Sequence, residues 1–122
     1  MSDRYGFADA DLMTIKEEIR TILIQLARSC KTITYSNLCA RIQTAYMHHR
    51  APGFHYLLRE LCRDEISAGR PVIGVVVVNK QTGRCGAGYF KFAAQMGADV
   101  SDPETYWNEE FERVCEYWGE AE

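Results

Sequence analysis

The apolar positions between residues 12 and 26 follow the period of an α-helix. Leucine or isoleucine recurs there at every third or fourth position, as in a helix that buries one side. The repeating positions are Leu12, Ile15, Ile19, Ile22 and Leu26. We therefore expect the chain to begin with an amphipathic helix, and Arg28 suits the negative end of its dipole.

Residues 31–69 are predicted to hold a short strand and two helices. Lys31–Thr34 is rich in strand-forming residues, and Thr34 or Ser36 can cap a brief helix that follows. Residues 43–52 have no period and indicate a loop, and Pro52 fits the first turn of a helix. This third helix would bury Phe54, Leu58, Leu61 and Ile66, and its other face would carry Tyr56, Arg59, Glu60 and Arg63.

The pattern changes after residue 70. Val72–Val78 is almost entirely β-branched and predicts a buried strand. Asn79–Gly83 predicts a turn, so Arg84–Gly88 would return as the second strand of a hairpin. A short helix over Tyr89–Met96 and a longer one starting at residues 101–104 complete the chain. The last helix has an apolar stripe made of Trp107, Phe111, Val114 and Trp118.

The order helix, strand, helix, helix and hairpin is that of a winged helix, a form of the helix-turn-helix. We therefore predict an α+β, mainly helical fold: a winged helix with two additional C-terminal helices. The 122 residues, of which 47% are hydrophobic, suit a single core. Residues 1–122 are predicted to form one winged-helix-like domain, with 98–122 as an acidic C-terminal helical extension.

Composition favours a cytoplasmic protein that does not enter a membrane. The longest apolar run, Val72–Val78, is about a third of the roughly 20 residues that a membrane helix needs. The N-terminal residues are polar and acidic, unlike those of a signal peptide. No two cysteines form a C-x-x-C pair, so we expect reduced thiols at all five positions. The cysteines are Cys30, Cys39, Cys62, Cys85 and Cys115.

The net charge of −3 conceals two segments of opposite sign. Residues 28–91 contain ten basic and three acidic residues, a net charge of +7. Residues 99–122 contain nine acidic residues and one arginine, a net charge of −8. The middle of the chain is therefore basic and its end is acidic.

The basic segment points to nucleic acid, and duplex DNA is one partner that we consider. In a winged helix the third helix commonly enters the major groove, while the hairpin contacts the backbone or the minor groove. Guanidinium groups suit both phosphates and guanine edges. The residues predicted to bind are Arg50, His55, Tyr56, Arg59, Arg63, Lys80, Gln81 and Arg84. Glu60, Asp64 and Glu65 on the same helix could neutralise these arginines.

The sequence gives little support for catalysis, so we predict no catalytic residue, no cofactor and no metal. His48 and His49 are adjacent and have no acidic residue at ligand spacing. Gly86-Ala87-Gly88 lacks the third glycine of a dinucleotide-binding loop, although an anion at the following helix stays an open alternative. A small thiol or histidine enzyme also stays open, with Cys85 as its nucleophile.

The aromatic stripe of the last helix has two interpretations. It could pack on the core of its own domain, which we favour. Alternatively, the acidic, tryptophan-bearing helix could form a surface for a protein partner or a homodimer, since aromatic residues are enriched at such interfaces. The second interpretation gives the alternative function, a winged-helix protein-interaction module.

Two segments resemble the winged-helix DNA-binding domain of the alkylguanine DNA alkyltransferases and of their alkyltransferase-like relatives. Thr34-Tyr35 matches in kind the family's T-Y-x-x-[IL]-A segment, and Asn79–Arg84 matches its N-x-x-G-R turn. The resemblance covers roughly half of the chain and implies the fold and DNA binding. The family's P-C-H-R motif is missing, because Pro71 is followed by Val72-Ile73-Gly74. Alkyl transfer is therefore not implied.

Overall fold

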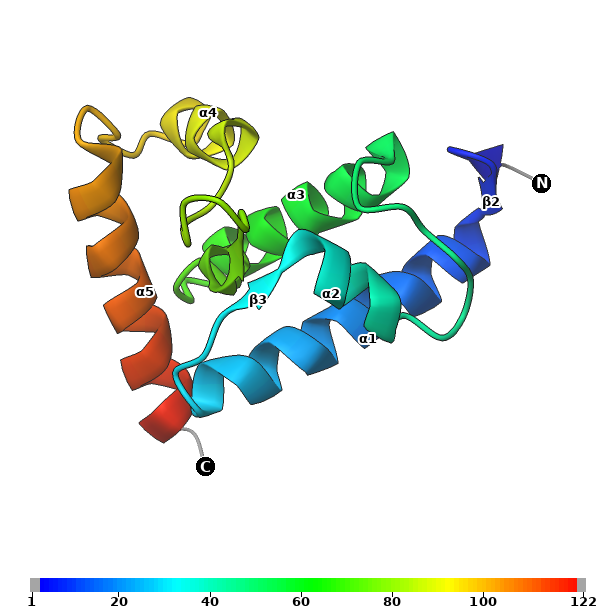
Figure 1. Ribbon diagram of the computed structural model, residues 1–122, viewed down its shortest axis with the longest axis horizontal. Coiled ribbons are helices and arrows are strands. Elements are labelled where there is room, and N and C mark those ends of the chain that lie inside the picture. The colour runs from blue at the N-terminus through cyan, green and yellow to red at the C-terminus, as the bar shows by residue number, and fades with distance from the viewer. Residues whose placement is uncertain (1–2, 121–122) are drawn as a thin grey trace.

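The chain forms a mainly helical structure with short strands, shown in Figure 1. The computed structural model describes residues 3–120, and the side chains of residues 5–119. The described helices are α1 (Asp9–Arg28), α2 (Tyr35–Arg41), α3 (Pro52–Ser67), α4 (Ala87–Gln95), α5 (Pro103–Glu120) and a 3₁₀ turn, η1 (Ile73–Val76). The described strands are β1 (Asp3–Arg4), β2 (Phe7–Ala8), β3 (Ile33–Thr34) and β4 (Val77–Val78). The predicted α+β, mainly helical class is confirmed, and residues 1–2 and 121–122 of the predicted domain lie outside the described residues.

The long helices are arranged around one core. α1 packs against α3, and α5 packs against α1 and stands across the end of the molecule where α1 ends (Figure 1). The two chain ends lie on opposite sides of the molecule (Figure 1). The apolar period of α1 predicted Leu12, Ile15 and Ile19 on its buried side, and these three are buried. Further along the helix the buried positions are Leu23 and Ala27, whereas the predicted Ile22 and Leu26 are only partly buried.

The segment Val72–Val78 is not the continuous strand that its β-branched residues predict. Residues 73–76 form η1, and only Val77 and Val78 form a strand, β4, which pairs in parallel with β3. Residues 73–78 are buried, and η1 contacts α1, α3 and α5. A 3₁₀ turn leaves backbone groups without sheet partners, and buried backbone groups need partners. Side chains supply them: Glu110 accepts from the Val72 N–H at 2.8 Å, and the Trp107 indole N–H donates to the Val75 carbonyl at 3.0 Å.

The predicted hairpin is also wrong. β4 pairs with β3, and residues 84–86 form no strand before α4 begins at Ala87. Residues 79–84 instead make a compact loop, closed by hydrogen bonds from Asn79 N–H to the Arg84 carbonyl at 2.6 Å and from Gly83 N–H to the Asn79 carbonyl at 2.9 Å. Gly83 has φ of +71°, as the predicted turn requires. The return strand fails because Cys85 turns inward and is only 4% exposed, its thiol lying 3.2 Å from the Val77 carbonyl.

The aromatic stripe of α5 faces the core. Trp107, Val114 and Trp118 are buried, and the ring of the partly buried Phe111 stacks on that of Trp107 at 4.9 Å between centroids. The core-packing interpretation is therefore confirmed. Within the described residues no helix is long and apolar enough to cross a membrane.

The expectation of five reduced cysteines is wrong. Cys30, which follows α1, forms a disulfide with Cys115 of α5, and their Cα atoms lie 5.0 Å apart. The two residues are 85 positions apart, so no local spacing could reveal the pair. Cys39, Cys62 and Cys85 are free thiols.

Gly74 gives a stability test of the packing around η1. A β-carbon added there would lie 2.5 Å from the sulfur of Cys62, which is buried in α3. We expect Gly74→Ala to lower the free energy of unfolding by about 1–3 kcal/mol through overpacking. Denaturant unfolding followed by circular dichroism measures this change.

Two further variants make the Gly74 test specific. Gly88→Ala serves as the matched control, because an added β-carbon there meets no atom within 4 Å. Adding Cys62→Ala to Gly74→Ala should restore part of the lost stability by removing the clashing sulfur. Equal stability of Gly74→Ala and the wild-type protein would contradict the packing described here.

Candidate binding pocket

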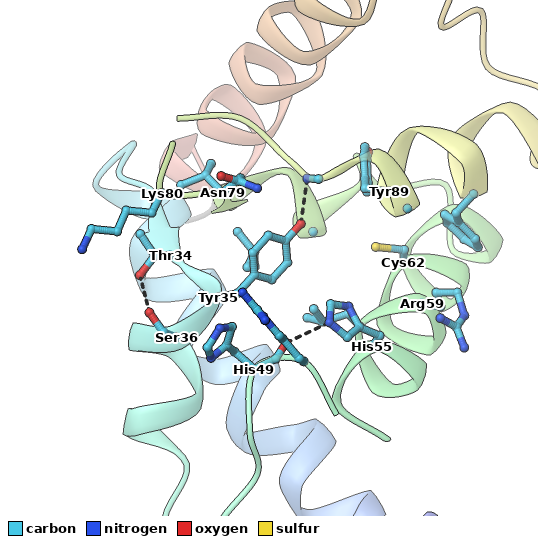
Figure 2. A pocket seen from close by; sticks show the side chains of 18 of the residues that line it. Thr34, Tyr35, Ser36, His49, His55, Arg59, Cys62, Asn79, Lys80 and Tyr89 are labelled. Carbon is cyan, nitrogen blue, oxygen red and sulfur yellow. Dashed lines mark hydrogen bonds between the residues drawn. The ribbon is translucent and has the colours of Figure 1, made fainter. Parts of the chain in front are cut away.

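A cavity of about 550 Å³ opens beside α3. Its walls come from the start of α2, one side of α3, the end of β4 with the loop that follows it, and the start of α4 (Figure 2). Its volume lies within the range of small-molecule and cofactor sites in proteins. Residues that are far apart in the chain therefore meet around one hollow.

The face of α3 that lines the cavity is rotated by about one residue from the face that the sequence predicted to be exposed. His55, Leu58, Arg59 and Cys62 line it, at the spacing of a single helical face. Tyr56 lies outside the pocket lining, with its ring 5.3 Å from that of Tyr5. The prediction treated Leu58 as a core residue, but Leu57 takes that place and is 2% exposed. Because both positions are leucine, the apolar pattern could not decide between them.

Tyr35 joins the start of α2 to the start of α4. Its hydroxyl oxygen accepts a hydrogen bond from the Gly86 N–H at 3.0 Å, which Figure 2 shows in the middle of the pocket. Thr34 fixes the first turn of α2, because its side chain accepts from the Asn37 N–H at 3.2 Å. Burial raises the pKa of Tyr35 to about 12, so the phenol stays neutral at pH 7.

The loop between α2 and α3 brings a histidine to the pocket. The Nε2–H of His55 donates to the His49 carbonyl at 2.8 Å, which fixes the loop against α3 (Figure 2). Desolvation, followed by electrostatic interaction with His48, Arg50 and His55, lowers the pKa of His49 below 6.5. His49 is therefore mostly neutral at pH 7, and an anion at this place would raise the pKa again.

The start of the same loop is held by a carboxylate of α1. Glu18 accepts from the N–H groups of Gln43 at 2.8 Å and Thr44 at 3.0 Å, and also from the Thr44 hydroxyl. These hydrogen bonds, led by the one from Gln43, lower the pKa of Glu18 below 4.5. Glu18 thus fixes the segment that carries His49 and Arg50 to the cavity.

The thiols near the pocket are poor nucleophiles. Burial raises the pKa of Cys62 to about 12 and raises the pKa of Cys85 as well. A thiol is reactive as its thiolate, so both groups are inert at neutral pH. Cys85 is therefore poorly suited to be the nucleophile of a thiol enzyme, the alternative that the sequence left open. Within the described residues, no group of three or more metal-ligating side chains could hold a metal ion.

Three cations around the cavity lack a charged partner among the described residues. Arg50, Arg59 and Lys80 are exposed, and none forms an ion pair with a residue that the structure describes. They come from three segments: the loop before α3, α3 itself and the loop after β4. In the view of Figure 2, Arg59 and Lys80 lie at opposite edges of the pocket.

Five of the eight predicted nucleic-acid-binding residues line the cavity: Arg50, His55, Arg59, Lys80 and Gln81. The other three do not. Tyr56 packs with Tyr5, as described above. Arg63 lies 3.7 Å from Glu60 and over the ring of Phe92, and Arg84 pairs with Glu104 of α5 at 2.7 Å. Sequence reasoning missed the aromatic walls, among them Tyr35, Tyr89 and Phe92.

Glu18 provides a pH test of the loop anchor. Because its pKa is lowered, its stabilising effect is complete above the ordinary value of 4.5 and is lost as the pH falls through the lowered pKa. We expect the amide protons of Gln43 and Thr44 to follow this titration in an NMR experiment. Glu18→Gln should abolish the titration, whereas Glu17→Gln, at the exposed neighbouring position, should leave it intact. Persistence of the titration in Glu18→Gln would contradict the anchor.

Three comparisons with known proteins find no match for this chain. No protein-family model matches it, and neither does a curated protein or a solved structure. The resemblance to the alkyltransferases therefore stays a prediction, and the proposed function depends on the residues and geometry of the pocket.

Proposed function

We propose that this protein binds nucleic acid without catalysing a reaction, through the cavity and the cations around it. One observation carries the proposal: three cations from separate segments, none paired with a residue that the structure describes, meet around a cavity with aromatic walls. Arg50, Arg59 and Lys80 would contact phosphates, which dominate the affinity of such complexes. The aromatic walls would contact a base, since bases stack on such side chains.

The cavity suits a single unstacked base better than a duplex edge. Tyr35 and Tyr89 line it together with His49 and His55. Aromatic and histidine rings offer flat surfaces to a base, and neutral Tyr35 keeps a hydroxyl proton to donate. A base that enters must leave its stack, which costs least in a mismatched or single-stranded region.

The winged-helix assignment belongs to the same proposal. α2 and α3 would act as the helix-turn-helix, and the loop of residues 79–84 would take the place of the hairpin wing. Lys80 and Gln81 in that loop line the cavity together with Arg59 of α3. α3 and the loop of residues 79–84 would then contact the same stretch of nucleic acid.

A protein-interaction module is less well supported. Its proposed anchors, Trp107 and Trp118, are 9% and 8% exposed, so they are not available to a partner. A small enzyme is also less well supported, because the thiols near the cavity are protonated at neutral pH. Non-catalytic binding uses the groups that are exposed.

The three cations can be tested by replacing them together. We expect Arg50→Ala, Arg59→Ala and Lys80→Ala in combination to weaken binding of a short DNA roughly a hundredfold at low salt. The slope of log affinity against log salt should fall by about two to three, because each lost phosphate contact removes up to one released counterion. Fluorescence anisotropy at several salt concentrations, with a duplex and with its separated strands, measures both quantities.

The control makes the same kind of charge change away from the cavity. Arg28→Ala removes an exposed cation at the end of α1 and should leave the affinity and the slope nearly unchanged. No binding of either DNA form at low salt would refute the proposal. Unchanged affinity in the triple variant would also refute it.

Photochemical crosslinking tests the base contact separately. An oligonucleotide that carries 4-thiothymidine should crosslink, on irradiation, to aromatic residues of the cavity such as Tyr35 and Tyr89. Tyr117 on α5 is 41% exposed and lies outside the cavity, so it should not react. Peptide mass spectrometry identifies the crosslinked residues. Crosslinks at Tyr117 but none in the cavity would contradict the base contact.

A further inference from the structure

The disulfide joins two elements at one end of the molecule. Cys30 lies just after α1, and Cys115 lies in the C-terminal half of α5. The C-terminal ends of these two helices lie near each other in Figure 1. Cys30 is exposed, whereas Cys115 is half-buried. A thiolate from solution can therefore approach the sulfur of Cys30 more easily than that of Cys115.

Cys30 holds a backbone position that usually carries glycine. Its φ is +54°, in the left-handed region, directly after the last turn of α1. The hydrogen bonds of this helix end are present: Cys30 N–H donates to the Ala27 carbonyl at 3.0 Å, and Lys31 N–H donates to the Leu26 carbonyl at 2.9 Å. A cysteine at this place is disfavoured by local conformation, but it points its sulfur at α5.

The two halves of α5 are held in different ways. The N-terminal half has polar bonds to the core, from Trp107 to the Val75 carbonyl and from the Val72 N–H to Glu110. In the C-terminal half, the buried indole N–H of Trp118 has no hydrogen-bond partner among the described residues. Arg20 lies over the Trp118 ring at 5.8 Å. The disulfide is thus the strongest link between the C-terminal half of α5 and the rest of the chain.

The three free thiols do not compete with the disulfide. Cys62 and Cys85 are buried and Cys39 is half-buried. Burial raises the pKa of Cys39 and Cys62 to about 12, so neither supplies a thiolate that could attack the bond at neutral pH. Exchange is therefore confined to an external thiol and this one bond.

We propose that Cys30–Cys115 is a reversible thiol–disulfide exchange site that locks the C-terminal half of α5 onto the end of α1. The reductant is a small thiol or dithiol. Its thiolate attacks the sulfur of Cys30, forms a mixed disulfide there and releases Cys115 as a thiolate. A second thiolate attacks the external sulfur, which frees Cys30 and leaves the reductant as its disulfide. Two thiols are oxidised, and one protein disulfide is reduced to two thiols.

Reduction should free one half of the helix and leave the other in place. Without the bond, Val114 and Trp118 keep their apolar contacts but lose the covalent constraint, while Trp107 and Glu110 keep their hydrogen bonds. The last turns of α5 would then open more often than the first turns. This lock is independent of nucleic-acid binding.

The test begins with the full-length oxidised protein and glutathione under native conditions. Mass spectrometry should find a mixed disulfide on the peptide that contains Cys30, followed by a protein with two additional thiols. The thermal midpoint should fall by roughly 10 °C and should return on reoxidation. Amide hydrogen exchange should rise at least about tenfold more over residues 114–119 than over residues 104–110.

Two variants distinguish the effect of losing the disulfide from the effect of the left-handed backbone conformation at Cys30. Cys115→Ser should reproduce the exchange pattern of the reduced protein. Cys30→Gly removes the same bond but relieves the left-handed position, so its thermal midpoint should lie above that of Cys115→Ser. Cys39→Ser, which keeps the bond, should behave as the wild-type protein.

Several results would overturn the proposal. The purified, air-oxidised protein could contain five free thiols, or its bond could yield to glutathione only in denaturant. Hydrogen exchange could rise equally along the whole of α5, which would mean that the bond acts on global stability alone and is no local lock.

Discussion

The structure depends on how the buried segment Val72–Val78 satisfies its backbone. This segment contacts α1, α3 and α5, so it joins the three long helices. Its 3₁₀ turn cannot form a sheet ladder, and a buried backbone group without a partner costs about 1–3 kcal/mol. Glu110 and Trp107 of α5 supply the missing hydrogen bonds, at Val72 and at Val75. The last helix is therefore part of the core and its docking is specific, because apolar contact alone would not fix its position along the segment.

The same segment positions the pocket. Gly74, Val77 and Val78 line the cavity, and Gly74 lets Cys62 of α3 approach closely. The Arg84 carbonyl closes the loop that carries Lys80, and Cys85 then returns the chain to the core. The pocket residues thus come from different elements, and two of these, α2 and α3, contact the central segment. A change in core packing would reach the pocket through this segment.

The sequence predicted those parts of the fold that depend on a regular period or on turn chemistry. The stripe of α5, the first three positions of the α1 stripe and the turn at Gly83 are found as expected. Where the pattern allows two outcomes, the prediction failed. A β-branched run suits a strand, but burial among three helices selects a 3₁₀ turn with only two paired residues. Adjacent leucines 57 and 58 left the rotation of α3 open, and tertiary packing decided it.

The residues predicted to bind are brought together only in part, for the same reason. Basic residues can be read from the sequence, and five of the eight chosen residues line the cavity. Their partners cannot be read, because ion pairs such as Arg84–Glu104 depend on the fold. The aromatic wall was missed because Tyr35 and Tyr89 are far apart in the chain and have no common motif. The disulfide was missed for this reason too, as 85 positions separate its cysteines.

The net charge of +7 over residues 28–91 therefore overstates the positive charge that is available to a ligand. Glu65 is fully buried, and its carboxylate binds both Arg70, at 2.6 Å, and Arg20 of α1, at 3.4 Å. Arg63 and Arg84 are paired as well, the second with the acidic helix. A cation already paired within the protein releases fewer counterions when it meets a phosphate, because it must first give up its carboxylate. The salt-dependent part of the affinity at the cavity should therefore depend on the three cations that are not paired with a described residue. The formal charge of the segment is a poor guide to this part of the affinity.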